Sequence, residues 1–153
     1  MEKYTIPKRK WHSNFKEAKD MLFKECNIVE VIYLPVGIEE SAKSNEVLLK
    51  DSSMKNIVYA IWEKVKGESN FKVKYVGHAK SNGSRTRLRN HLFKKHEKTG
   101  SKLKYVTDSI TSDNNIGVTF VEIDPGYFRS AIEEYIIGST PDLVWNIHSK
   151  SKK

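Results

Sequence analysis

The sequence predicts an α/β (α+β) domain in which a small, mainly antiparallel, three-stranded sheet is flanked by helices. A length of 153 residues suits one domain that buries about two-thirds of its unfolded surface. Short β-branched and aromatic runs at residues 57–63, 71–76 and 117–123 are typical of strands. Apolar residues at helical spacing lie before, between and after these runs, as expected of helices that cover a sheet.

The first third of the chain is expected to extend this core. Residues 1–13 are basic and predict an arm, and residues 14–26 predict an amphipathic helix with Ser13 as its cap. Residues 29–34 suggest a strand, and residues 39–49 a short helix. We therefore divide the chain into an extension (1–55), a core (56–148) and a basic tail (149–153).

Two of the strands are expected to form a hairpin that brings two tyrosines together. The loop at residues 64–70 contains Gly67, which favours a turn between residues 57–63 and 71–76. Tyr59 and Tyr75 then lie on adjacent antiparallel strands.

A tight turn and a helix follow the hairpin. Gly77 stands where the chain leaves the sheet, and Ser84 is a suitable cap for a helix towards Gly100. Arg87 and His91 are four residues apart on that helix, so they share a face.

The remaining elements complete the core. Residues 102–106 and 117–123 are expected to be extended. Asp124 and Pro125 favour the start of a second helix, which Gly138 ends. Glu133 lies at the edge of the apolar stripe of this helix.

The charge of the chain points to a polyanionic partner. The net charge is +8, and residues 64–104 hold 13 Lys or Arg residues against two acidic ones. Such a concentration favours nucleic acid as the partner, and a solvated lysine-rich surface is the alternative.

Cysteine use and hydropathy restrict the setting. Cys26 is the single cysteine, which excludes a disulfide within the chain and a cysteine-based zinc site. We expect a cytoplasmic protein with no membrane contact, because no signal-peptide pattern or membrane-length apolar run is present.

Five short elements follow one another at a suggestive spacing. They are Ile57-Val58-Tyr59, Tyr75-Val76-Gly77, Arg87 with His91, Glu133-Glu134-Tyr135-Ile136-Ile137, and Asn146 after Pro141. Together they resemble the signature of the GIY-YIG nuclease family over residues 56–147. Ile57 stands where the family has glycine. Arg85 and Arg89 compete for the arginine position, and the four-residue spacing to His91 selects Arg87.

The resemblance implies a metal-dependent endonuclease that hydrolyses phosphodiester bonds in double-stranded DNA with Mg²⁺ or Mn²⁺. The short chain most resembles a compact type II restriction endonuclease, with a homodimer or higher oligomer expected on DNA. The alternatives are a repair or mobile-element nuclease and a non-catalytic nucleic-acid-binding protein on the same fold.

The resemblance also assigns roles to the acidic and basic candidates. Glu133 would bind the metal, with Glu134 as its rival and an exposed helix glutamate as the alternative reading. Arg87 would hold a phosphate oxygen. The expected DNA-binding residues are Lys80, Arg85, Arg89, Lys94 and Lys95.

The aromatic and polar candidates have two readings each. Tyr59 would orient or deprotonate a water with help from a cation such as Lys74, or it packs in the sheet, a reading that fits Tyr75 better. His91 would relay a proton or is a buried, hydrogen-bonded residue. His78 would face the site. Gly77 and Asn146 are expected to have structural roles.

Overall fold

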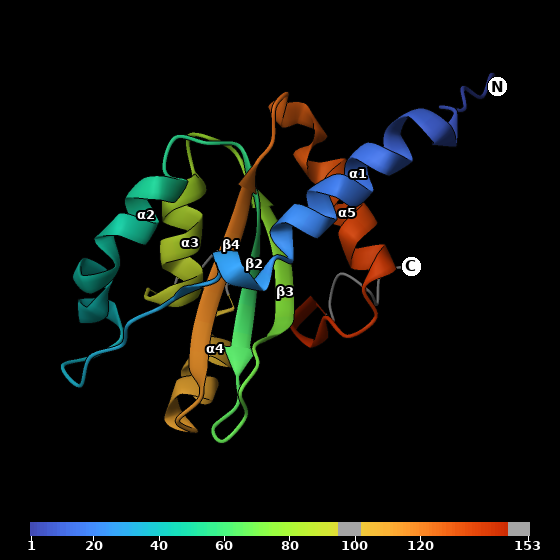
Figure 1. Cartoon of the computed structure of the whole chain (residues 1–153). Helices are drawn as coiled ribbons and strands as arrows, with labels where there is room; N and C mark the ends of the chain where they lie inside the picture. Colours follow the sequence, from blue (N-terminus) through green and yellow to red (C-terminus); the bar gives the residue numbers. More distant parts are fainter. Residues whose placement is uncertain (95–101, 147–153) are drawn as a thin grey trace.

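The centre of the molecule is a four-stranded antiparallel sheet with the strand order β1-β4-β2-β3 (Figure 1). The computed structural model describes residues 1–94 and 102–146. The expectation of three strands is wrong by one, because a short N-terminal strand pairs with β4. The strands are β1 (Val29–Glu30), β2 (Ile57–Lys64), β3 (Lys72–Ala79) and β4 (Asn115–Glu122).

Helices cover both faces of the sheet (Figure 1). Helices α2, α3 and α4 lie on one face, and α1 and α5 lie on the other. The α-helices are α1 (Lys8–Leu22), α2 (Glu46–Ser52), α3 (Ser84–Leu92), α4 (Leu103–Thr111) and α5 (Arg129–Ser139). Short 3-10 helices are η1 (Glu25–Asn27), η2 (Glu39–Asn45), η3 (Gly126–Phe128) and η4 (Val144–Asn146).

The central strand β2 explains why the sheet needs two helical layers. Its residues from Ile57 to Trp62 are all buried, so over this length neither face of the strand meets water. Side chains alternate across a strand. Tyr59 and Ile61 therefore belong to the core on the α3 side, whereas Val58 and Ala60 belong to the core on the α5 side.

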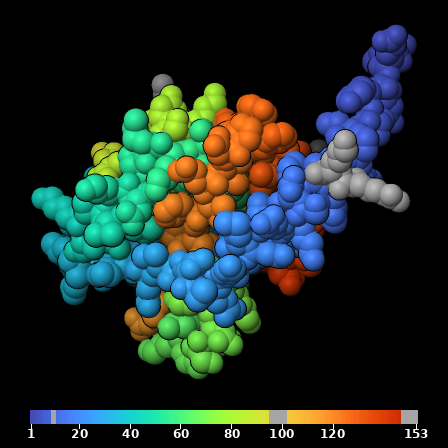
Figure 2. Space-filling view, turned by 45° about the horizontal axis from the view of Figure 1, so that its top comes forward, coloured from blue at the N-terminus to red at the C-terminus, as the bar shows by residue number. Residues whose placement is uncertain are grey.

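The first third of the chain is built into these layers. Strand β1 adds to β4, α1 packs against α5 and β4, and α2 packs against α3. Helix α1 begins at Lys8, directly after Pro7, so the expected start at Asn14 is corrected. The Trp11 and Phe15 rings, 5.1 Å apart, show the i, i+4 spacing of the added turns. The arm before α1 therefore comprises residues 1–7 rather than 1–13, and this end of the chain projects from the body of the molecule (Figure 2).

One predicted strand is a helix. The run at residues 102–106 was expected to be extended, but α4 begins at Leu103 and continues to Thr111. Val106 and Ser109 are buried on one face of α4, three residues apart. That helical spacing decides the structure over the strand preference of the Tyr-Val pair.

Two helix starts also differ from expectation. Gly83, rather than Ser84, stands at the N-cap of α3, and no side chain caps that helix. Pro125 precedes the 3-10 turn η3, so α5 begins only at Arg129. None of the described helices has both the length and the apolar character that crossing a membrane requires.

Candidate active site

The candidate site begins where β2 and β3 pair. Tyr59 of β2 lies opposite Gly77 of β3, and its phenol ring covers that glycine. A Cβ atom at position 77 would lie 2.6 Å from Tyr59 Oη and 2.7 Å from its Cζ. The ring therefore keeps this position only because residue 77 has no side chain.

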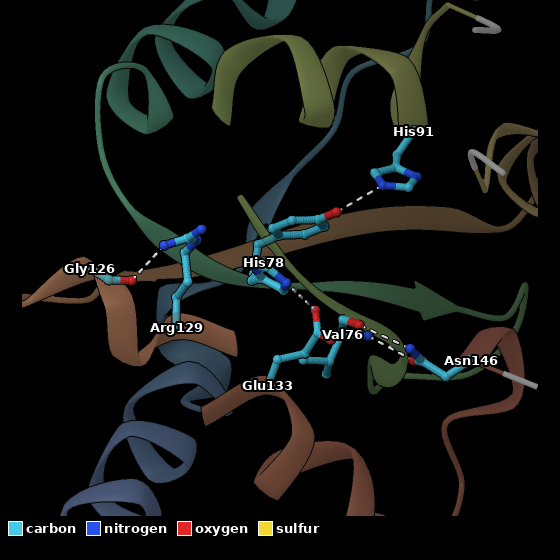
Figure 3. A network of polar contacts seen from close by, with 8 residues as sticks. Val76, His78, His91, Gly126, Arg129, Glu133 and Asn146 are labelled. Carbon is cyan, nitrogen blue, oxygen red and sulfur yellow. Dashed lines mark hydrogen bonds and ion pairs between the residues drawn. The ribbon is translucent and has the colours of Figure 1, made fainter. Parts of the chain in front are cut away.

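Helix α3 brings a histidine to the same phenol. The distance between Tyr59 Oη and His91 Nε2 is 2.8 Å (Figure 3). The main-chain N–H of Lys102 donates to the other ring nitrogen, His91 Nδ1, at 2.9 Å. Burial, with help from the charges of Arg87 and Lys102, lowers the pKa of His91 to about 3.

These facts assign the proton on His91. A neutral imidazole has one N–H, and Nδ1 is an acceptor here. The proton is therefore on Nε2, which donates to Tyr59 Oη. His91 is 2% exposed and hydrogen-bonded at both nitrogens.

Tyr75 completes a cluster of three rings. Its centroid lies 6.1 Å from that of Tyr59 and 5.3 Å from that of His91. Tyr59 is 0% exposed and Tyr75 is 7% exposed. The packed position that the sequence favoured for Tyr75 thus describes Tyr59 better.

Both phenols stay protonated near neutral pH. Burial, and then the neighbouring Tyr75, holds the pKa of Tyr59 well above its ordinary value, against the lowering effect of Arg87. Burial also raises the pKa of Tyr75, with Arg87 opposing and Glu133 adding to the rise. In this arrangement the two phenols can hold neighbouring groups by hydrogen bonding more readily than they can remove a proton.

The positive charge of Arg87 connects the two sides of the site. It opposes the rise in pKa that burial causes at Tyr59 and Tyr75 on the α3 side and at Glu133 on the α5 side. Arg87 itself is exposed, so its guanidinium can meet a ligand from solution. A planar cation beside two phenols suits a phosphate diester.

The other basic candidates lie around this centre. Arg85 Nη2 contacts Glu46 Oε2 at 2.8 Å, and Arg89 is exposed. Lys80 is exposed, and Lys94 Nζ lies 3.8 Å from Glu39 Oε1. Lys95 lies outside the described residues.

Lys74 takes a different position from the one expected. Ile61 pairs with Tyr75 and Trp62 with Val73, which leaves Lys74 as the extra residue of a bulge. Its Nζ lies 3.7 Å from Glu63 Oε1. Lys74 is thus paired with a carboxylate, and the cation that acts on Tyr59 is Arg87.

Glu133 faces β3 from α5. Its Oε2 lies 3.9 Å from His78 Nε2, and the two side chains are 22% and 31% exposed (Figure 3). Burial raises the pKa of Glu133 to about 7, although Arg87 opposes the rise. Glu134, its rival, is exposed.

The donors at Glu133 fit a metal ion only in part. Glu133 offers a carboxylate and His78 an imidazole nitrogen, both reachable from solvent. Within residues 1–94 and 102–146, no three His, Cys, Asp or Glu side chains form a group suited to a metal. A Mg²⁺ ion would therefore keep most of its waters, as this ion commonly does.

Asn146 fixes the end of the chain against the sheet. Its Oδ1 accepts the Val76 N–H and its Nδ2 donates to the Val76 carbonyl, both at 2.9 Å (Figure 3). Val76 lies between Tyr75 and Gly77, so the bond holds β3 beside the site. This is a structural position, as the sequence suggested.

Sequence analysis missed one residue of the site, Lys102, which it placed only in the expected extended run at residues 102–106. Lys102 donates its main-chain N–H to His91 and places Nζ 5.4 Å from the centre of the Tyr75 ring. It belongs to none of the five signature elements, and no spacing singled it out. Only the packing of α4 against α3 brings Lys102 to the site.

The chain was compared with protein-family models, curated proteins and solved structures, and none of the three comparisons found a match.

Proposed function

We propose that the protein is a metal-dependent endonuclease that hydrolyses phosphodiester bonds in double-stranded DNA. The observation that supports this best is the meeting of four elements at the β3 edge. Tyr59, Tyr75, Arg87 and His91 come together on one side, and the charge of Arg87 extends to Glu133 on the other. The resemblance to the GIY-YIG signature uses these same residues.

Each residue then has a part that follows from its environment. Arg87 binds a non-bridging phosphate oxygen and stabilises the charge that develops there. His91 holds Tyr59 by the bond from Nε2, and the buried Tyr59 in turn supports Tyr75 and Arg87, its hydrogen-bond neighbours. Tyr75 lies nearer the surface and closes the ring cluster.

Glu133 is the proposed metal ligand, with His78 beside it. A bound Mg²⁺ or Mn²⁺ would supply charge neutralisation and assistance to the leaving oxygen. We further propose a restriction role and an oligomer on DNA.

The first experiment is cleavage of supercoiled plasmid by the full chain with Mg²⁺, with Mn²⁺ and with EDTA, followed by sequencing of the ends. Metal-dependent cuts at one sequence support a restriction nuclease. Salt-sensitive DNA binding without any cleavage overturns the nuclease and favours the non-catalytic binding protein.

Three arginines of α3 allow a sharper test. Arg87→Ala is expected to lower the single-turnover rate at saturating DNA by at least about a hundredfold, the scale of losing one preorganised donor. Arg85→Ala and Arg89→Ala are matched controls on the same helix. They are expected to weaken binding and to recover the rate when enzyme is raised. Recovery by Arg87→Ala with failure of a control would move the role to another arginine.

Binding itself is expected to depend steeply on salt, because of the excess of Lys and Arg over residues 64–104. Each phosphate that the protein neutralises on duplex DNA adds roughly −0.9 to the slope of log K against log salt concentration. A slope near zero in a fluorescence-anisotropy titration would contradict the electrostatic basis of the proposal.

A further inference from the structure

Lys102 lies at the start of α4 with its charge directed at aromatic rings. Its Nζ is 5.4 Å from the centre of the Tyr75 ring and 5.6 Å from that of Tyr105. Tyr105 in turn stacks on Trp145, with ring centroids 5.6 Å apart and an interplanar angle of 20°. The ammonium group is thus held in place by cation–π contacts on packed rings.

A second cation, Arg87, acts on the same Tyr75 ring that the Lys102 ammonium contacts. Burial, and then the charge of Arg87, lowers the pKa of Lys102. Both cations also lower the pKa of His91. Two positive charges that converge in this way repel each other unless an anion lies near.

The described residues supply no such anion to Lys102. Among residues 1–94 and 102–146, no carboxylate lies within ion-pair distance of its Nζ, whereas Arg85, Lys74 and Lys94 each have one. The carboxylate of Glu133, the acidic residue of the candidate site, faces His78. Glu133 acts on Tyr75 and Arg87 from the α5 side, but no described carboxylate pairs with the Lys102 ammonium itself.

We infer that Lys102 and Arg87 together form a phosphate-binding site, in which Lys102 Nζ contacts an oxygen of the DNA backbone beside Tyr75. This inference rests on the proposed function and adds a residue outside its signature. A phosphodiester fits the site because it carries one delocalised negative charge and several acceptor oxygens. The two cations differ in form, since Arg87 offers a planar fork and Lys102 a point charge.

The side chain of Lys102 can be tested apart from its main chain. Lys102→Met keeps the N–H that bonds His91 Nδ1, and it keeps a long stem over the rings, but it removes the charge. Lys102→Arg restores a cation. Lys104→Met is the matched control, because Lys104 is exposed two residues further along the same helix.

Single-turnover cleavage at saturating DNA is the first measurement. Lys102→Met is expected to lose about a hundredfold in rate, the effect of removing one charged donor from a phosphate. Lys102→Arg is expected to recover to within about tenfold of the wild type, since it replaces the cation. Lys104→Met is expected to match the wild type. Equal rates for Lys102→Met and Lys104→Met, with both proteins folded by circular dichroism, would overturn the inference.

A second measurement does not depend on cleavage. The pKa of the Lys102 amine is followed by NMR in protein with ¹³C-labelled lysine, with and without a short DNA duplex in EDTA. A phosphate at Nζ is expected to raise this pKa by at least about one unit, because an opposite charge favours the ammonium form. An unchanged Lys102 resonance, with the duplex bound, would overturn the inference.

The two measurements separate the inference from the proposed function. If the wild-type protein never cleaves DNA but its Lys102 resonance responds to the duplex, the proposed nuclease function is refuted and the inferred phosphate site stands. If the wild-type protein cleaves DNA but Lys102→Met cleaves as fast as Lys104→Met, the nuclease function stands and the inferred phosphate site is refuted.

Discussion

Two histidines meet two partners on opposite sides of β3, and they do so in different ways. We call Tyr59 with His91 the enclosed pair and His78 with Glu133 the open pair. The enclosed pair bonds at 2.8 Å, with both residues at 2% exposure or less. The open pair is 3.9 Å apart, and its side chains are 31% and 22% exposed.

The polar atoms of the two pairs are satisfied to different degrees. Both ring nitrogens of His91 are hydrogen-bonded, one to Tyr59 and one to the Lys102 main chain. Among the described residues, His78 Nδ1 is buried and has no hydrogen-bond partner. Folding thus satisfies both nitrogens of His91 and leaves one buried polar atom of the open pair without a hydrogen bond.

The largest effect is expected from the open pair. Glu133→Gln should reduce cleavage by at least about a thousandfold, the upper range for one charged group. DNA binding should persist or tighten, because a carboxylate that repels phosphate is removed. The measurements are plasmid cleavage with Mg²⁺ and DNA binding by anisotropy.

Glu134→Gln is the control for that change, since Glu134 is the next residue on α5 and is exposed. It should cleave at the wild-type rate. If Glu134→Gln is inactive and Glu133→Gln cleaves normally, the ligand role belongs to Glu134.

The enclosed pair should be disrupted by a substitution that crowds the Tyr59 ring. Gly77→Ala places a methyl group 2.6 Å from Tyr59 Oη, so the phenol must shift from the position in which it bonds His91. We expect about 1–3 kcal/mol of lost stability, as for other overpacked sites. Cleavage should fall by about a hundredfold when a positioned group is displaced. Urea denaturation and single-turnover kinetics measure the two effects.

Gly138→Ala is the matched glycine substitution, because a Cβ there meets no atom within 4 Å. In helix α5 it should be neutral or should stabilise by up to about 1 kcal/mol. Stability losses of equal size at Gly77 and Gly138 would contradict the packing explanation.

The enclosed pair should also make stability depend on pH. The pKa of His91 is about 3 in the folded protein and 6.5 ordinarily, so the unfolded chain binds the extra proton between these values. This contribution is fully present above pH 6.5 and is lost as the pH falls, by about 1.4 kcal/mol per pH unit. Wild type and His91→Gln are compared by urea denaturation between pH 7.5 and pH 5.

His91→Gln has no imidazole to protonate, so its stability should fall less steeply with acid. The gap between the two proteins should therefore shrink as the pH is lowered. A gap that stays constant down to pH 5 would show that the pKa of His91 is the same in the folded and the unfolded states.

The smallest effect is expected from His78. His78→Ala should change the free energy of unfolding by less than about 1 kcal/mol, since a loose and partly exposed pair contributes little. Chemical denaturation at neutral pH measures it. A larger loss would show that the open pair supports the fold as the enclosed pair does.

Local sequence signals were sufficient for the hairpin and for the face of α3. The turn at Gly67 and the β-branched runs placed Tyr59 and Tyr75 on paired strands, and four-residue spacing placed Arg87 with His91. Such features depend on neighbours in the chain, which a sequence displays directly.

Features that depend on distant segments were missed. A strand was predicted at residues 29–34, but not that it would span only two residues, nor that it would join the sheet as a fourth strand beside β4. The bulge that directs Lys74 to Glu63 is a shift in pairing that composition does not reveal. Lys102 joins the site through the approach of α4 to α3, which no residue spacing encodes.

The bond between Asn146 and Val76 has a consequence for association between molecules. Strand β3 is an edge of the sheet, and an unpaired edge strand is a template for another chain. The Asn146 amide occupies both the N–H and the carbonyl of Val76, as one residue of a neighbouring strand would. A single side chain thus protects the middle of this edge from intermolecular pairing, and Asn146→Ala would expose a site where aggregation can begin.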